Sequence, residues 1–248
     1  MKILSIGNSF SQDAQRYLYR LAEKNRIELH NVNLYIAGCS LERHVRNIND
    51  DAEAYSYEVH GEHGQRSISI KEALLSDEWD YVTLQEVSTR SYAIDGFKEH
   101  LGTVRDYVKQ YAKDAKILLH KTWGYPEDYL GGRFPTTEDM YSRIERVYKE
   151  ASNLIHADGI SPSGEVLLRL MKKGYRVHRD THASYKLGRY ALALTWLEYL
   201  SGIDARELLD ISLDECDESV PEGAIATAKE CVHEAILSKD SFYCCGSY

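Results

Sequence analysis

The chain of 248 residues carries 30 lysines and arginines against 39 aspartates and glutamates, which gives a formal net charge of −9. This balance argues against nucleic acid or an anionic membrane as a partner, because binding either requires a basic surface that neutralises phosphates. With 43% hydrophobic residues, the composition is that of an ordinary soluble globule, and the length favours one domain over residues 1–248. Residues 203–248 are expected to form a C-terminal helical appendix of that domain.

No segment near the N-terminus has the pattern of a signal peptide, because Asn8 and Ser9 interrupt an apolar start of only a few residues. No apolar run is long enough to span a bilayer. The five cysteines have no regular spacing and do not predict a disulfide framework. We interpret Cys244 and Cys245 as an incidental pair in a frayed tail. A cytoplasmic, reduced protein is therefore expected.

The first dozen residues organise the rest of the chain. Residues 2–6 are predicted to form a short buried strand, residues 7–9 a tight turn, and Ser11 the start of an amphipathic helix. Ser9 would then lie at the carboxyl edge of a sheet beside a helix N-terminus, where negative charge is stabilised and open α/β sheets bind ligands. The simpler interpretation is that Asn8, Ser9 and Ser11 are only turn and cap residues, which these residue types favour.

Strands and helices alternate along the rest of the chain. Further strands are expected at residues 28–37, 79–85, 116–123 and 159–164. Helices are expected at residues 13–24, 68–75, 97–112, 136–155, 165–172, 187–200 and 222–237. This alternation predicts an α/β fold with a parallel sheet covered by helices on both faces.

Residues 47–65 are polar and lack clear periodicity, so we expect an irregular excursion with a short hairpin near His60 and His63. Histidines suggest metal ligands, but no third ligand stands at a recognisable spacing. A surface turn is the preferred interpretation, and the sequence does not decide whether the excursion acts as a lid.

Acyl transfer by serine needs a base, an acid that orients the base, and N–H donors for the oxyanion, and the sequence offers a residue for each task. Ser9 follows the first predicted strand, Gly38 the second and Gln85 the third. Asp180 and His182 precede a late helix. Because the carboxyl ends of parallel strands share one edge of a sheet, these residues are expected to converge. Simpler roles are a strand end at Gln85, an N-cap at Asp180 and a surface histidine at His182.

Four sequence blocks occur in order: IGNSFS at residues 6–11, GCSLE at 38–42, YVTLQ at 81–85, and RDTHAS at 179–184 followed by GRY at 188–190. Together they resemble the blocks of the SGNH (GDSL-like) hydrolases, and more narrowly the bacterial DUF4886 branch, which opens with GNSFS rather than GDS. The resemblance covers residues 2–202. It implies a three-layer, flavodoxin-like α/β fold with about five parallel strands flanked by helices.

By this resemblance Ser9 is the nucleophile, His182 the general base and Asp180 the acid that orients it. The oxyanion hole would combine the backbone N–H groups of Ser9 and Gly38 with a side-chain donor in the third block. That donor is usually an asparagine, whereas this chain has Gln85, which also donates but reaches one methylene further. The acid usually lies three residues before the histidine, whereas Asp180 lies two before it. The alternative is a Ser–His dyad in which a backbone carbonyl orients the histidine.

The resemblance also implies a serine esterase that removes a small, acetyl-like acyl group from an ester such as an acetylated sugar, without metal or cofactor. The 19 tyrosines are compatible with a sugar ligand. Trp123 and Tyr125 lie where the fourth predicted strand ends and are expected to line the substrate wall. His120 and Glu86 are expected to support the site or the fold. The alternative is a non-catalytic sugar- or anion-binding module that keeps the fold but has lost turnover through the shortened spacing between Asp180 and His182. A nucleotide binder is disfavoured because GxGxxG and GxxxxGK[ST] are absent.

Overall fold

The computed structural model describes residues 1–64, 66–214 and 216–238. Within them, one sheet has the strand order β4-β3-β2-β1-β5-β6-β7. The strands are β1 (Lys2–Gly7), β2 (His30–Tyr35), β3 (Tyr55–Val59), β4 (Ser67–Ile68), β5 (Tyr81–Leu84), β6 (Lys116–His120) and β7 (Gly159–Ser161). The strands β2, β1, β5, β6 and β7 run parallel, and β3 and β4 continue the sheet antiparallel beyond β2.

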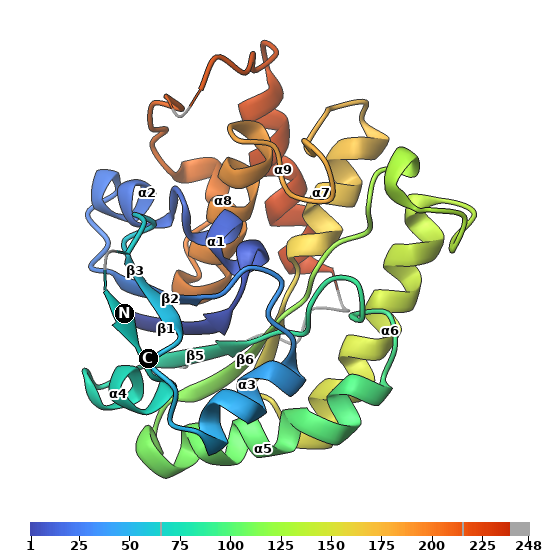
Figure 1. Ribbon diagram of the computed structural model, residues 1–248. Coiled ribbons are helices and arrows are strands. Elements are labelled where there is room, and N and C mark those ends of the chain that lie inside the picture. The colour runs from blue at the N-terminus through green and yellow to red at the C-terminus, as the bar shows by residue number, and fades with distance from the viewer. Residues whose placement is uncertain (65, 215, 239–248) are drawn as a thin grey trace.

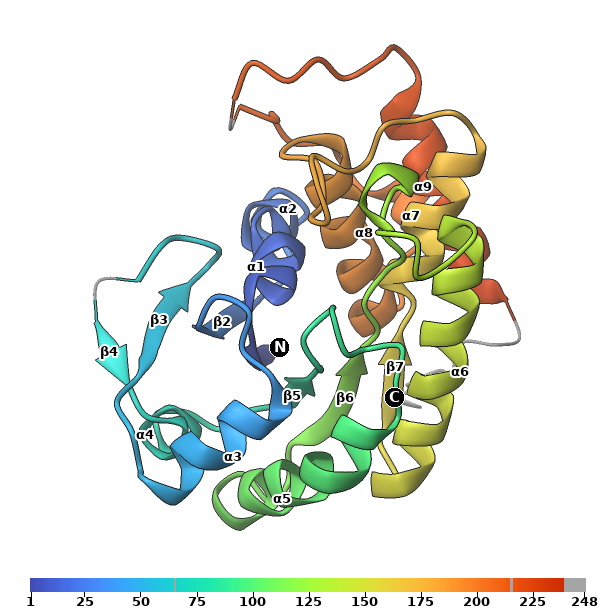
Figure 2. The same cartoon turned by 45° about the vertical axis from the view of Figure 1, so that its right-hand side comes forward.

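Helices cover both faces of this sheet (Figures 1 and 2). They are α1 (Ser9–Gln15), α2 (Leu18–Lys24), α3 (Leu41–Asn49), α4 (Ile70–Leu75), α5 (Asp95–Tyr111), α6 (Thr137–Ile155), α7 (Ser163–Lys172), α8 (Leu187–Ser201) and α9 (Ala224–Leu237), with short 3-10 turns η1 (Glu127–Tyr129) and η2 (Ala205–Glu207). One face carries α1, α2 and α8, with α7 and α9 packed on α8, and the other carries α3 to α6. The three-layer α/β fold predicted from the sequence is thus confirmed.

The burial of α8 explains its sequence. All of its residues from Leu187 to Tyr199 are buried, because the helix lies near the sheet on one side and against α7 and α9 on the other. A helix that is covered all round has no need of a polar face. The charged residues Arg189 and Glu198 are therefore exceptions within α8 that require partners.

The single helix predicted over residues 13–24 is two helices in the structure, because α1 and α2 meet at Arg16 and Tyr17. The first of them begins at Ser9, two residues before Ser11, where the helix was predicted to start. Oδ1 of Asn8 accepts the N–H of Phe10 at 3.0 Å and caps the helix. The cap interpretation of Asn8 is therefore correct, and Ser9 is the first helical residue.

The excursion over residues 47–65 contributes to the sheet. Strand β3 pairs with β2 on one side and β4 on the other, both antiparallel, so the hairpin expected near His60 and His63 is present. His60 adopts a positive φ of 56° and stacks on Tyr19 with ring centroids 3.7 Å apart. These features fit the predicted turn.

Cys39, Cys216 and Cys231 are free thiols in the part of the chain that the structure describes. Cys244 and Cys245 lie outside the described residues. Burial raises the pKa of the Cys39 thiol to about 12, so this side chain is an inert buried group beside Gly38.

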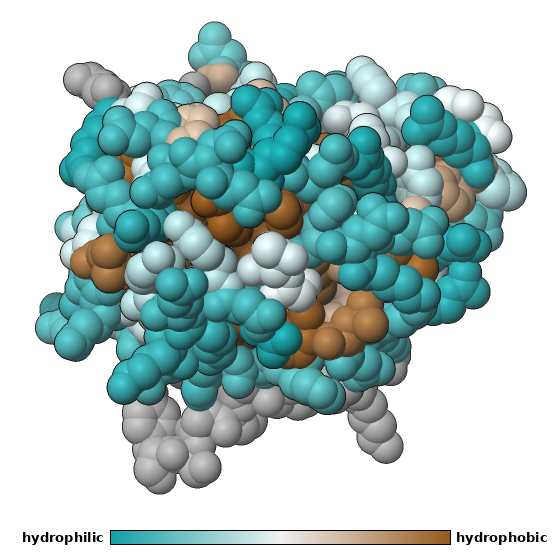
Figure 3. All heavy atoms as spheres, turned by 60° about the horizontal axis from the view of Figure 1, so that its bottom comes forward, coloured by the Kyte–Doolittle hydropathy of each residue, from teal (hydrophilic) through white to brown (hydrophobic). Residues whose placement is uncertain are grey.

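On the face shown in Figure 3, hydrophilic residues predominate and hydrophobic ones form separate small groups between them. Across the described ranges, none of the helices combines the length and the apolar character that crossing a membrane requires.

Candidate active site

The turn from β1 into α1 is held tightly. A Cβ at Gly7 would lie 2.2 Å from Oγ of Ser11, so only glycine allows the strand to approach the helix this closely. Oγ of Ser11 also accepts the backbone N–H of Asn8 at 3.1 Å, which closes a capping box. The turn therefore fixes Ser9 at the carboxyl end of β1.

The structure brings Ser9, His182 and Asp180 into one hydrogen-bonded row. Nε2 of His182 lies 2.9 Å from Oγ of Ser9, and Nδ1 lies 2.7 Å from Oδ1 of Asp180. Ser9 begins α1, whereas the other two residues lie between α7 and α8. The side chains of His182 and Asp180 are 27% and 43% exposed, so solvent reaches the row.

The short spacing between Asp180 and His182 does not prevent their contact. Oδ1 of Asp180 also accepts the backbone N–H of His182 at 2.6 Å, as in an Asx-turn. Burial raises the pKa of the Asp180 carboxyl, but the hydrogen bonds from His182 outweigh burial and hold this pKa below its usual value. An ionised carboxylate only accepts, so the ring proton lies on Nδ1 and Nε2 accepts from the Ser9 hydroxyl. A carboxylate rather than a backbone carbonyl is thus the partner of Nδ1.

Aromatic packing holds the segment that carries His182. Nε1 of Trp123 donates to the carbonyl oxygen of Thr181 at 3.0 Å, and the indole stacks on Phe10 with ring centroids 4.1 Å apart. Trp123 is completely buried and offers no open face to a substrate. The expectation that it lines the substrate wall is corrected here: its contacts instead fix the residue before His182.

Two buried side chains connect the loops at this edge. The Tyr125 hydroxyl donates to Oγ of Ser88 at 2.7 Å, so this side chain joins the loops after β6 and β5 and leaves little surface for a substrate. Oε1 of Glu86 accepts the backbone N–H groups of Leu41 at 3.1 Å and Val87 at 2.6 Å. Burial raises the pKa of the Glu86 carboxyl, and these two N–H groups oppose that shift. Glu86 thereby fastens the start of α3 to the end of β5.

The turn between β2 and α3 contacts the turn that carries Ser9. Gly38 has a φ of +59°, a left-handed conformation that glycine adopts without strain. The next residue, Cys39, accepts a hydrogen bond at its carbonyl from Nδ2 of Asn8 at 2.9 Å. Among the described residues, the N–H groups of Gly38 and Ser9 have no hydrogen-bond partner.

Gln85 lies behind Asn8 rather than on the surface of the site. It is buried; its Nε2 donates to Oδ1 of Asn8 at 2.7 Å, and its Oε1 lies 2.8 Å from Nδ1 of His120. Because the carboxamide oxygen accepts, Nδ1 of His120 carries the proton. Burial lowers the pKa of His120 to about 3, so the ring is neutral. Gln85 therefore orients Asn8, and its direct contact with an oxyanion stays a prediction.

A buried ion-pair cluster beside the His182 loop was not predicted from the sequence. Asp13 of α1 is completely buried and contacts the guanidinium groups of Arg179 and Arg189. The sequence contained a signal, because Asp13 directly precedes the apolar Ala14 and Arg189 interrupts an apolar helix. Charged residues in such places are buried only when they are paired.

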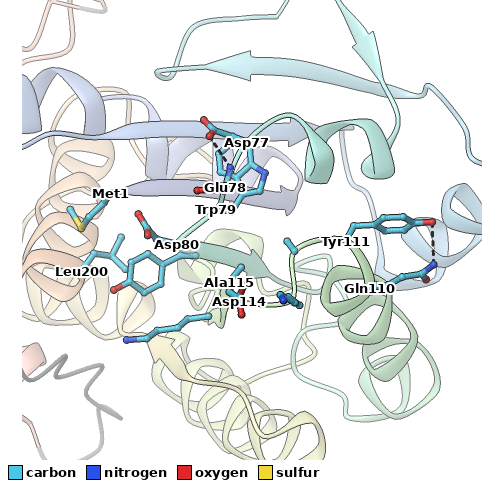
Figure 4. A pocket seen from close by; sticks show the side chains of 14 residues that line it. Met1, Asp77, Glu78, Trp79, Asp80, Gln110, Tyr111, Asp114, Ala115 and Leu200 are labelled. Carbon is cyan, nitrogen blue, oxygen red and sulfur yellow. Dashed lines mark hydrogen bonds between the residues drawn. The ribbon is translucent and has the colours of Figure 1, made fainter.

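A cavity of about 750 Å³ lies at the opposite edge of the sheet (Figure 4). Its lining includes Met1 and residues 77–80 and 112–115, which precede β1, β5 and β6. Asp77, which lines the cavity, is paired with Nζ of Lys2 at 2.6 Å. The cavity is therefore separate from the candidate active site, which lies at the carboxyl ends of the strands.

Glu198, Asp204 and His233 form a group of metal-type ligands within the described ranges. Glu198 lies about 16 Å along α8 from the helix start that follows the His182 loop. Nδ1 of His233 is 2.8 Å from Oε1 of Glu198, and the Asp204 carboxylate is paired with Arg206. These groups satisfy one another and connect α8, η2 and α9.

A sequence profile of the DUF4886 family, described as a domain of unknown function, matches residues 2–229. A solved structure of a DUF4886 family protein from Bacteroides uniformis shares 34% sequence identity with the chain. Its alignment covers 97% of this chain and 96% of that chain, with a TM-score of 0.88. No curated protein matches the chain.

Structures of more distant proteins have the same fold. A putative SGNH hydrolase from Slackia heliotrinireducens is 20% identical, with 81% of this chain and 98% of that chain covered and a TM-score of 0.58. An acetylxylan esterase from Geobacillus stearothermophilus is 16% identical, with 79% and 92% covered and a TM-score of 0.51. At these identities the likeness concerns the fold, and the predicted resemblance to SGNH hydrolases is confirmed at that level.

Proposed function

The chain belongs to the DUF4886 family, and we propose that it is a serine esterase that removes a small acyl group through Ser9, His182 and Asp180. The observation that carries the proposal is the row of hydrogen bonds, at 2.9 Å from Ser9 to His182 and 2.7 Å from His182 to Asp180. Serine hydrolases of unrelated folds use this constellation, which is recognised by its geometry and by the role of each group.

In the proposed mechanism, Nε2 of His182 takes the hydroxyl proton while Oγ of Ser9 attacks the ester carbonyl carbon. Asp180 holds the ring in the required tautomer and stabilises the imidazolium. The tetrahedral intermediate collapses, the C–O bond to the alcohol breaks, and the alcohol leaves with the proton from His182. Water then gives a proton to the same histidine and attacks the acyl-enzyme, which releases the acid and restores the Ser9 hydroxyl.

The oxyanion of each tetrahedral intermediate would accept hydrogen bonds from the backbone N–H groups of Ser9 and Gly38. Both groups are without an intramolecular partner in the described part of the chain, and they lie in turns that Asn8 fixes. Donors that are fixed in advance need no reorganisation during the reaction. Loss of one such donor typically lowers the rate on the order of a hundredfold.

We propose an acetyl-like acyl group and a carbohydrate alcohol as the substrate class. The acetylxylan esterase with the same fold supports this choice. A net charge of −9 disfavours polyanionic substrates.

The test is hydrolysis of p-nitrophenyl acetate by the wild type and by the variants Ser9→Ala, His182→Ala and Asp180→Ala. We expect the first two to reduce kcat to background and the third to lower it by about a thousandfold or more. Ser40→Ala is the matched control, because Ser40 caps α3 at the same sheet edge and its Oγ accepts the backbone N–H of Arg43. A silent wild type that a fluorophosphonate also leaves unlabelled, or an active Ser9→Ala, would refute the proposal.

A further inference from the structure

We infer that Asp13 is a positioning residue, whose buried carboxylate locks the loop that carries His182 to the helix that carries Ser9. The inference rests on the proposed function for its effect on turnover. Its effect on the loop itself is measurable without any turnover.

Four N–H donors converge on the Asp13 carboxylate. Oδ1 lies 2.8 Å from Nε of Arg189 in α8 and 3.3 Å from both terminal nitrogens of Arg179. Oδ2 accepts the backbone N–H of Ala183, the residue after His182, at 3.0 Å. One buried carboxylate thus connects α1, α8 and the His182 loop.

The connection is short on both sides. Asp13 follows Ser9 by four residues, which is about one turn of α1. Arg179, which Asp13 binds, also donates to the carbonyl oxygen of Ala183, so the loop is held at the N–H and the C=O of a single residue. The nucleophile and the base therefore sit at two ends of one rigid link.

Tyr185 covers the cluster from outside. Its ring centroid lies 4.5 Å from the Arg179 guanidinium carbon and 4.8 Å from that of Arg189. A cation held against an aromatic face loses mobility and is shielded from water. The ion pairs that position the loop are thus protected although the neighbouring His182 is open to solvent.

Every partner of Asp13 is a donor, so both carboxylate oxygens must accept. Asp13→Asn keeps the shape but replaces one oxygen by an NH₂ group, which faces either the Ala183 N–H or the arginines. Glu58 offers a matched control, because it is also buried and binds α1 through Nε2 of Gln12 at 2.6 Å. Its other oxygen accepts from Asn33 of β2, so Glu58→Gln makes the same chemical change on the other side of α1.

The test measures amide hydrogen exchange over residues 176–184 and steady-state hydrolysis of p-nitrophenyl acetate. In Asp13→Asn we expect exchange in this segment to accelerate roughly tenfold relative to the rest of the chain. We expect kcat to fall on the order of a hundredfold with KM within about twofold, because the change misplaces the base and not the substrate. Glu58→Gln should leave the exchange of this segment and kcat within about twofold of the wild type.

A folded Asp13→Asn with wild-type exchange over residues 176–184, or with kcat within about threefold of the wild type, overturns the inference. If the wild type itself does not hydrolyse esters, the proposed function fails and the exchange experiment alone decides the positioning. If Asp13→Asn does not fold, Arg179→Lys replaces it, because this side chain is 22% exposed. Lysine keeps the charge but has no planar fork to hold both Asp13 and the Ala183 carbonyl, so the same acceleration and loss of kcat are expected.

Discussion

The Asn8 side chain makes three hydrogen bonds around Ser9, the proposed nucleophile. It accepts from the N–H of Phe10, donates to the carbonyl of Cys39 and accepts from Nε2 of Gln85. Phe10 follows Ser9 and Cys39 follows Gly38, so one residue sets the orientation of both N–H groups proposed to bind the oxyanion. At the scale of single residues, the buried Asn8 side chain therefore holds both turns of the site in place.

This arrangement predicts that Gln85 acts through Asn8. In a double-mutant cycle, Gln85→Ala and Asn8→Ala should each lower kcat, on the order of tenfold or more, and the double variant should be no worse than the more damaged single variant. The reason is that Gln85 has nothing left to orient once the Asn8 side chain is gone. The measurement is kcat for p-nitrophenyl acetate.

Additive losses would show instead that Gln85 contacts the oxyanion itself. Gln15 provides the control cycle, because it is a buried glutamine of α1 that binds Ser5 and Val32. The effects of Gln15→Ala and Gln85→Ala should add, since the two side chains share no partner.

The sequence predicted which side chains meet better than it predicted their surroundings. The convergence of Ser9, Asp180 and His182 was predicted because their residue types stand in recognisable blocks. The burial of Trp123 was not, because an aromatic residue after a strand packs inward or outward according to helices far away in the sequence, here Phe10 of α1. The arginine partners of Asp13 likewise lie more than 160 residues away.

At the scale of elements, the parallel strands of the sheet were predicted from the sequence. Of the antiparallel edge formed by β3 and β4, only a short hairpin was predicted. Strand β3 alternates poorly, with Tyr55 and Glu58 as its buried residues, so no period of two marks it. No glycine or proline marks the break between α1 and α2 in the sequence. These features follow from packing between elements rather than from local preference.

The turn between β2 and α3 yields a prediction at this scale. Gly38→Ala meets no steric obstacle, since an added Cβ has nothing within 4 Å, but its φ of +59° strains any other residue by about 1 kcal/mol. We expect the turn to relax and its N–H to rotate away, with kcat falling on the order of a hundredfold. Circular dichroism melts and ester hydrolysis measure the two effects.

Gly202→Ala is the matched control for this turn. Gly202 also has a positive φ, of 73°, and open space at its Cβ, but it ends α8 far along the helix from His182. Both variants should lose a similar amount of stability, and only Gly38→Ala should lose turnover. Equal turnover in the two variants would contradict the assignment of Gly38 to the oxyanion hole.

Three buried histidines link the stability of the whole molecule to pH. Burial lowers the pKa of His44 to about 3, of His120 to about 3 and of His178 to about 4. An unfolded histidine binds its proton below about pH 6.5. Between these pH values the unfolded chain binds more protons at these sites than the folded one, so the free energy of unfolding decreases as the pH falls.

Buried carboxyl groups act in the opposite direction. Burial raises the pKa of Glu58 and of Glu86, so the folded chain binds protons there before the unfolded chain does. Their contribution to stability grows as the pH falls and is lost as the pH rises through the folded pKa. The histidine contribution must therefore be isolated by substitution rather than read from the wild type alone.

His44→Gln isolates one histidine. His44 lies in α3, completely buried, with Nδ1 2.8 Å from the Tyr55 hydroxyl, a bond that glutamine can also make. Plotted against pH between 6 and 4, the free energy of unfolding should fall less steeply in this variant than in the wild type, by up to about 1.4 kcal/mol per pH unit. Urea titrations at several pH values measure this slope, whatever constant loss the substitution causes. A wild-type slope in His44→Gln would show that His44 takes up its proton in the folded chain.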